Sequence, residues 1–152
     1  ALEGFGAPFI GRMIDQVGWD MVAPVAFGLS CANGSVGFLL LLVAESAGPE
    51  ASSVLLTSIL VCVLVFFGLV AIADLCVKSM GVAWRETTVL VQGDDLGSAV
   101  GPVLGYFLLQ VGLPASAVLA AQAVIHGSAA LVALSAARLH ARTLVPAGAL
   151  RS

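Results

Sequence analysis

Charged residues are scarce in this chain: only 10% of its 152 residues are Asp, Glu, Lys or Arg. Soluble domains carry about a quarter charged residues, so the composition excludes an ordinary water-soluble fold. Hydrophobic residues make up 60% of the chain, which predicts an integral membrane protein in contact with the lipid bilayer. No basic cluster with interleaved aromatic residues occurs, so we expect no nucleic acid partner.

Patterns typical of enzymes and metal proteins are also missing. The sequence has two histidines, no HExxH motif and no phosphate-binding glycine loop with a lysine. Cys31, Cys62 and Cys76 lie in apolar runs without CxxC spacing, which favours small buried side chains over a disulfide framework or a zinc site. We therefore expect no catalytic set, no metal and no cofactor.

The sequence begins at Ala1 inside an apolar stretch, with neither an initiator methionine nor a signal-peptide pattern. We expect residues 1–10 to be the end of a truncated transmembrane helix. The chain is then a fragment of a longer protein.

Long apolar runs, by contrast, are abundant. Four of them cover roughly residues 21–44, 53–77, 96–111 and 115–137. About 20 helical residues cross a hydrocarbon core of about 30 Å, and the third run reaches this length only if its helix starts near Thr88. The expected fold class is an all-α polytopic membrane protein. It has four transmembrane helices within residues 21–137, plus the end of a fifth.

Basic residues occur on one side of the predicted membrane only. All six fall in three segments: 11–20, 78–93 and 138–152. The positive-inside rule makes these segments cytoplasmic, so residues 11–20 form a cytoplasmic loop and 138–152 a cytoplasmic C-terminal tail. The segment 78–93 is either an interfacial helix, with Trp84 at headgroup depth, or an ordinary loop.

Two motifs stand out against this background. In residues 11–18 (GRMIDQVG), Gly11 and Gly18 allow a sharp reversal between two helices. Asp15 can accept hydrogen bonds at a neighbouring helix N-terminus, and Arg12 can pair with a carboxylate.

The second motif is a glycine face on the third apolar run. Gly97, Gly101 and Gly105 recur every four residues, so they share one face of a helix that another helix can approach closely. Pro102 removes a backbone donor and favours a bend. We expect a tightly packed, bendable helix here.

Together these motifs resemble the major facilitator superfamily. Residues 11–18 are similar to its cytoplasmic loop signature G-x-x-x-D-x-x-G, and residues 95–105 (DLGSAVGPVLG) are similar to its glycine-rich fifth or eleventh helix. The bases that often follow the loop aspartate are missing here, which is typical of the C-terminal copy of this repeated signature. The chain thus resembles part of the C-terminal six-helix half; the N-terminal half is the alternative.

The resemblance implies a secondary active transporter in a bacterial inner (plasma) membrane. It would move a small solute, coupled to protons or another ion, by alternating access of two six-helix bundles. Its partners would be the missing half of the same protein and an unidentified small-molecule substrate. Gly11, Arg12, Asp15 and Gly18 would form a conformational latch, although Asp15 could equally be a helix N-cap.

Ionisable residues inside the membrane supply the remaining candidates. Glu3 and His126 are candidate substrate or proton sites; for His126 the alternative is a neutral imidazole bonded to a backbone carbonyl. Asp94 and Asp95 are expected to cap a helix. Two other functions stay open: a small membrane scaffold or pore subunit, and a membrane enzyme that uses Asp94 and Asp95.

Overall fold

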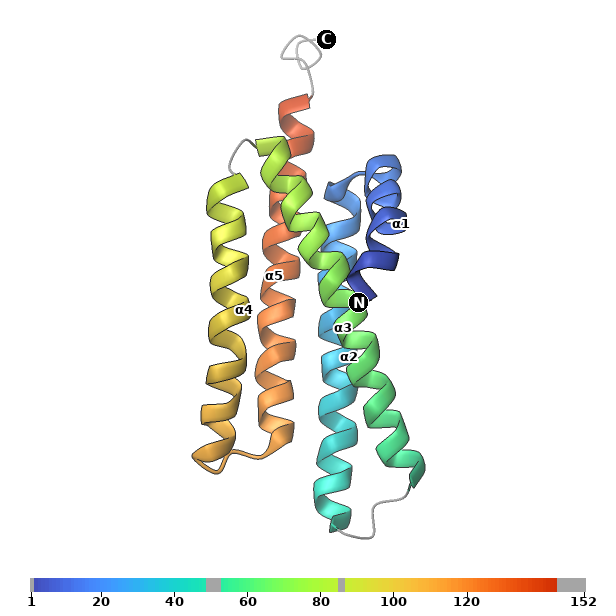
Figure 1. Ribbon diagram of the computed structural model, residues 1–152, viewed down its shortest axis with the longest axis vertical. Helices are drawn as coiled ribbons and strands as arrows, with labels where there is room; N and C mark the ends of the chain where they lie inside the picture. The colour runs from blue at the N-terminus through green and yellow to red at the C-terminus, as the bar shows by residue number, and fades with distance from the viewer. Residues whose placement is uncertain (1, 49–52, 85–86, 145–152) are drawn as a thin grey trace.

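The computed structural model describes residues 2–48, 53–84 and 87–144 (Figure 1). Within these ranges the side chains of residues 2–7, 83–84, 87–91, 93–95, 98 and 143–144 are not described. The described residues form five helices: α1 (Leu2–Val17), α2 (Trp19–Ala47), α3 (Ser53–Trp84), α4 (Thr87–Gln110) and α5 (Ala115–Leu144). The predicted all-α class is confirmed.

The reversal between α1 and α2 takes place at a single residue, Gly18. Its φ of 93° lies in the left-handed region, and its N–H donates to the Ile14 carbonyl at 2.8 Å. The sequence predicted a loop over residues 11–20, whereas the structure continues α1 through Val17. The physical reason is that Ile14, only 5% exposed, packs in the core, and this burial favours helix up to the last turn.

Helix α2 is the centre of the packing. It lies along α5 on one side and along α3 on another, while α1 covers only one end of α2 and α3 (Figure 1). Helix α4 contacts α3 and, less, α5. The core cluster contains Ile14, Trp19, Val22, Ala23, Cys76 and Ala133.

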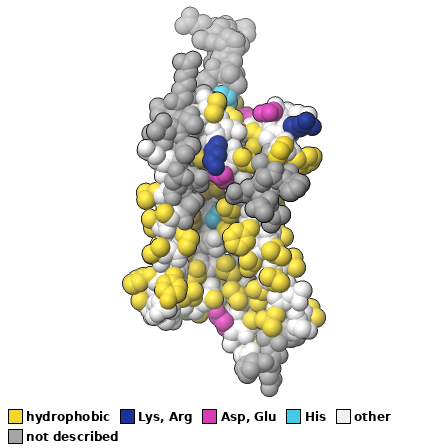
Figure 2. Space-filling model, in the orientation of Figure 1, with side chains coloured by type: hydrophobic (Ala, Val, Ile, Leu, Met, Phe, Trp, Pro, Cys, Tyr) yellow, Lys and Arg dark blue, Asp and Glu magenta, His cyan; other side chains and the backbone are white. Residues whose placement is uncertain are grey.

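Three described helices are long and apolar enough to cross a membrane. These stretches are Trp19–Ala47, Ser53–Val82 and Ala115–Arg142. Large hydrophobic side chains cover much of the outer surface (Figure 2), as expected for contact with a lipid bilayer. Among the residues of α4 whose side chains are described, the apolar stretch is Ala99–Gln110, so length and composition do not establish the fourth predicted crossing.

The two ends of the bundle differ in charge. Helices α2 and α3, and likewise α4 and α5, are joined at one end, whereas the α1–α2 and α3–α4 junctions and the end of α5 lie at the other (Figure 1). On the face in Figure 2, Lys and Arg side chains appear only towards the second end. Lys78 pairs there with Asp74 at 2.6 Å, and this i,i+4 ion pair lies along one face of α3.

Candidate functional site

The loop-signature residues lie at the end of α1. Arg12 and Asp15 are exposed, and no ion pair or hydrogen bond joins either to another described side chain. Gly11 is inside the helix, and no described atom lies within 4 Å of a Cβ added there, whereas Gly18 has the positive φ at the reversal. The structure therefore brings Arg12 and Asp15 to one exposed helix end but shows no closed latch among the described residues.

The glycine face of α4 is open. No described atom lies within 4 Å of a Cβ added at Gly97, Gly101 or Gly105, so the tight packing expected of this face does not occur within the described part of the chain. Pro102 is exposed and lies inside α4, as predicted. Asp94 and Asp95 lie inside α4, which begins at Thr87, so the expectation that they cap the start of a helix is wrong. Their side chains are not described.

The tightest helix contact occurs instead between α2 and α5. A Cβ added at Gly34 would lie 3.3 Å from the Cβ of Ala123, and one at Gly127 would lie 3.2 Å from the Cys31 sulfur. Sequence reasoning missed this seam. The signal that could have found it is the spacing of small residues on α2, namely Ala23, Ala26, Ser30, Gly34 and Gly37, which repeats at three and four positions.

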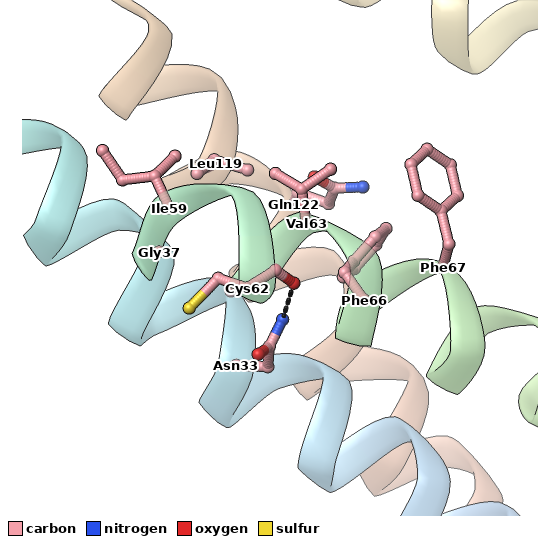
Figure 3. A pocket seen from close by; sticks show the side chains of 10 residues that line it. Asn33, Gly37, Ile59, Cys62, Val63, Phe66, Phe67, Leu119 and Gln122 are labelled. Atoms are coloured by element: carbon pink, nitrogen blue, oxygen red, sulfur yellow. Dashed lines mark hydrogen bonds between the residues drawn. The ribbon is translucent and has the colours of Figure 1, made fainter. Parts of the chain in front are cut away.

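A partly open pocket of about 170 Å³ lies where α2, α3 and α5 meet (Figure 3). It is lined by Asn33, Gly34, Gly37, Ile59, Cys62, Val63, Phe66, Phe67, Leu119 and Gln122. The two glycines of α2 leave the space, since Gly37 brings the Leu119 side chain to 3.2 Å from where a Cβ would stand. The walls are mostly apolar, and among the described residues no carboxylate, lysine or arginine lines them.

Two side-chain amides supply the polarity of this pocket. Asn33, the central residue of α2, donates from Nδ2 to the Cys62 carbonyl oxygen on α3 at 2.9 Å. In Figure 3 the Gln122 amide lies beside Val63, on the side of Phe66 and Phe67. No hydrogen bond joins the Gln122 side chain to another described residue, so its donors and acceptor can meet a bound molecule.

His126 lies one turn beyond Gln122 on α5, next to this pocket. Its Nδ1 is 2.8 Å from the Gln122 backbone oxygen, and because a carbonyl oxygen only accepts, Nδ1 carries the proton. The imidazole packs edge-on against Phe66, with ring centroids 5.1 Å apart. The structure thus shows the carbonyl-bonded imidazole, the alternative weighed above, and it also places His126 behind the pocket wall.

The other sequence candidates do not join this group. The side chain of Glu3 lies outside the described residues. Among the residues whose side chains are described, no group of three or more His, Cys, Asp or Glu could hold a metal ion. Asn33 and Gln122 were not singled out from the sequence, although uncharged amides inside long apolar runs are a usable signal for such a site.

Comparison with known proteins adds no relative: no family model, no curated protein and no solved structure matches the chain.

Proposed function

We propose that the chain is part of a secondary active transporter of the major facilitator type, which moves a small solute by alternating access, coupled to protons or another ion. The observation that supports it best is the pocket lined by Asn33 and Gln122. It lies between three helices of membrane-crossing length, and solute sites of secondary transporters lie near the bilayer midplane. A purely structural bundle has no need for a hollow that is lined by a side-chain amide, that of Gln122, without a described hydrogen-bond partner.

In this proposal α4 is the fourth crossing. Its 24 residues correspond to about 36 Å of helix, which is enough to span the hydrocarbon core. The open face of Gly97, Gly101 and Gly105 would then contact a helix of the other six-helix half, and Pro102 would let α4 bend as the halves move.

The charged end of the bundle would face the cytoplasm of a bacterial cell. The described basic residues Arg12, Lys78, Arg138 and Arg142 belong to this end, so the positive-inside rule puts the C-terminus in the cytoplasm. Arg12 and Asp15 are exposed there, so they are free to contact the other half in one conformation and release it in the next.

Labelling of Cys62, a thiol that lines the pocket, tests this function. The full-length protein carrying Cys31→Ala is treated with a membrane-impermeant maleimide in spheroplasts and in inverted vesicles. A Cys31→Ala/Cys62→Ala protein serves as the control for Cys76, whose side chain is fully buried. Leakage of a small dye from vesicles is measured in parallel.

Alternating access expects Cys62 to be labelled from both faces without dye leakage, since the pocket opens to one side at a time. Labelling from both faces together with leakage would establish a pore and overturn the transporter proposal. Labelling from neither face would favour a scaffold, or an enzyme that uses Asp94 and Asp95 at the surface.

A further inference from the structure

The pocket between α2, α3 and α5 is specific enough to indicate the class of its ligand. We propose that it binds an uncharged, single-ring solute that carries a carboxamide or a similar paired donor and acceptor, which Gln122 recognises. This inference rests on the proposed function, because it names the substrate class of the same site.

Size sets the first limit. A protein cavity of about 150 Å³ holds one benzene molecule, and this pocket has a volume of about 170 Å³. Its volume therefore matches one ring with a small substituent. A disaccharide, a peptide or a fused polycyclic molecule would extend out of the open side of the pocket.

Shape and apolarity favour a flat ring over a sugar. Phe66 and Phe67 lie on one side of the pocket, and Ile59, Val63 and Leu119 supply aliphatic walls (Figure 3). Aromatic faces and edges pack favourably against another ring. A monosaccharide would bury several hydroxyl groups against these walls without partners, at a cost for each group.

Charge excludes organic acids and amines. None of the described residues that line the pocket is a carboxylate, lysine or arginine, and the nearest described imidazole, His126, already donates its Nδ1 proton to the Gln122 backbone oxygen. An ionised ligand would lose its hydration without gaining a counter-charge.

The polar group is the most specific part of the argument. Gln122 has an acceptor oxygen and a donor NH₂ with no described protein partner, whereas Asn33 uses its NH₂ on the Cys62 carbonyl and keeps its oxygen as an acceptor. A ligand amide presents the matching donor and acceptor side by side. It can form two hydrogen bonds with Gln122 at once.

Benzamide and benzoate provide the test, because they have nearly the same shape and differ in charge. Binding of each to the full-length protein in nanodiscs is measured by saturation-transfer NMR, with empty nanodiscs as the control for partition into lipid. We expect saturable binding of benzamide and at least about tenfold weaker binding of benzoate. Equal or tighter binding of benzoate would overturn the assignment of an uncharged ligand.

Variants at Gln122 identify the site. Gln122→Met keeps the length of the side chain and should weaken benzamide binding about tenfold, the effect of one to two lost hydrogen bonds. Gln110→Met is the matched control, since Gln110 is an exposed glutamine in the last turn of α4, outside the pocket. It should bind as the unmodified protein does. Thermal unfolding of both variants verifies that they are folded.

The outcomes separate this inference from the function on which it rests. If benzamide shows no saturable binding, or if Gln122→Met binds it as tightly as the unmodified protein does, the ligand assignment is wrong. The Cys62 labelling experiment uses no ligand, so two-sided labelling would still support a transporter in that case.

Discussion

Glu45, in the last turn of α2, accepts two hydrogen bonds from Ser116 at the start of α5. The backbone N–H of Ser116 donates to Oε1 at 3.0 Å, and its hydroxyl donates to Oε2 at 2.6 Å. The first N–H groups of a helix have no partner within the helix, so Glu45 caps α5 from a residue 71 positions away. This contact joins the two most extensively packed helices at the end opposite to the basic residues.

The Glu45–Ser116 contact predicts coupling between the two residues in stability. Glu45→Gln and Ser116→Ala should each lower the unfolding temperature, because each removes a charge-assisted hydrogen bond. The double variant should be hardly less stable than the worse single one, since both changes remove the same contact.

Exposure of Cys76 measures this coupling. Its side chain is fully buried in the folded protein, so in a Cys31→Ala/Cys62→Ala background its reaction with a thiol-reactive dye reports unfolding. Ser46→Ala is the control, because the Ser46 hydroxyl bonds only within α2, to the Val43 carbonyl at 2.8 Å. Additive effects of the two single variants would show that the Ser116 hydroxyl and the Glu45 carboxylate are not coupled in stability.

The close contact between α2 and α5, at Gly34 and Ala123 and at Cys31 and Gly127, predicts that two glycines of α2 differ in how well they accept a larger side chain. Gly34→Leu should destabilise the bundle by about 1–3 kcal/mol, because its side chain would overlap Ala123 across the seam. Gly28→Leu should change stability by less than about 0.5 kcal/mol, since no described atom lies within 4 Å of a Cβ there. The free energy of unfolding of the two variants is compared in detergent by the reaction of the Cys76 thiol with a dye. Equal losses of stability would mean that α2 and α5 are not tightly packed at Gly34.

The apolar runs predicted where most of the helices lie in the sequence, but they did not predict how the helices pack against one another. The apolar runs 21–44, 53–77 and 115–137 all lie inside helices that continue several residues further, for instance α3 as far as Trp84. Helices extend past the apolar run because backbone hydrogen bonding does not end where the hydrocarbon ends. Composition alone therefore sets the number of long helices but not their ends.

The pocket could not be predicted because it depends on how three helices are rotated. In a soluble bundle, an apolar stripe indicates which face points inwards, but helices in lipid are apolar on all sides. Asn33 and Gln122 can be recognised in the sequence as amides within apolar runs. The sequence does not show, however, that Asn33 faces the Cys62 carbonyl on α3. The open face of Gly97 and Gly101 shows the same limit: glycine spacing predicted a packing face but not its partner.

In the proposed transporter, loss of the Asp15 charge should shift the balance between its two conformations. Asp15→Asn keeps the size of the side chain and removes its charge, so contacts with the other half that depend on charge weaken in one conformation only. The ratio of cytoplasmic to external labelling of Cys62 should change about two- to fivefold, as expected for one electrostatic contact near a helix end. Asp20→Asn, at the start of α2, is the comparison within the same junction. An unchanged ratio in Asp15→Asn would leave Asp15 as a solvated surface residue.

Substitution of Gly101 tests whether another helix packs on the glycine face of α4. Within the described residues Gly101→Leu meets no atom, so the described bundle alone should tolerate it. If a helix of the other half packs on Gly97, Gly101 and Gly105, the same change in the full-length protein inserts a side chain into a close helix contact. It should then cost about 1–3 kcal/mol.

The control for Gly101→Leu is Val100→Leu, which enlarges an exposed side chain at the neighbouring position on a different face of α4. Thermal unfolding and two-sided labelling of Cys62 are compared for the two variants in the full-length protein. A loss confined to Gly101→Leu requires a partner surface that the described residues do not supply, since no described atom lies within 4 Å of a Cβ at this position. Equal behaviour of both variants would mean that the glycine face is exposed to lipid, and α4 would then have no tight contact through which a motion of the other half could reach the pocket.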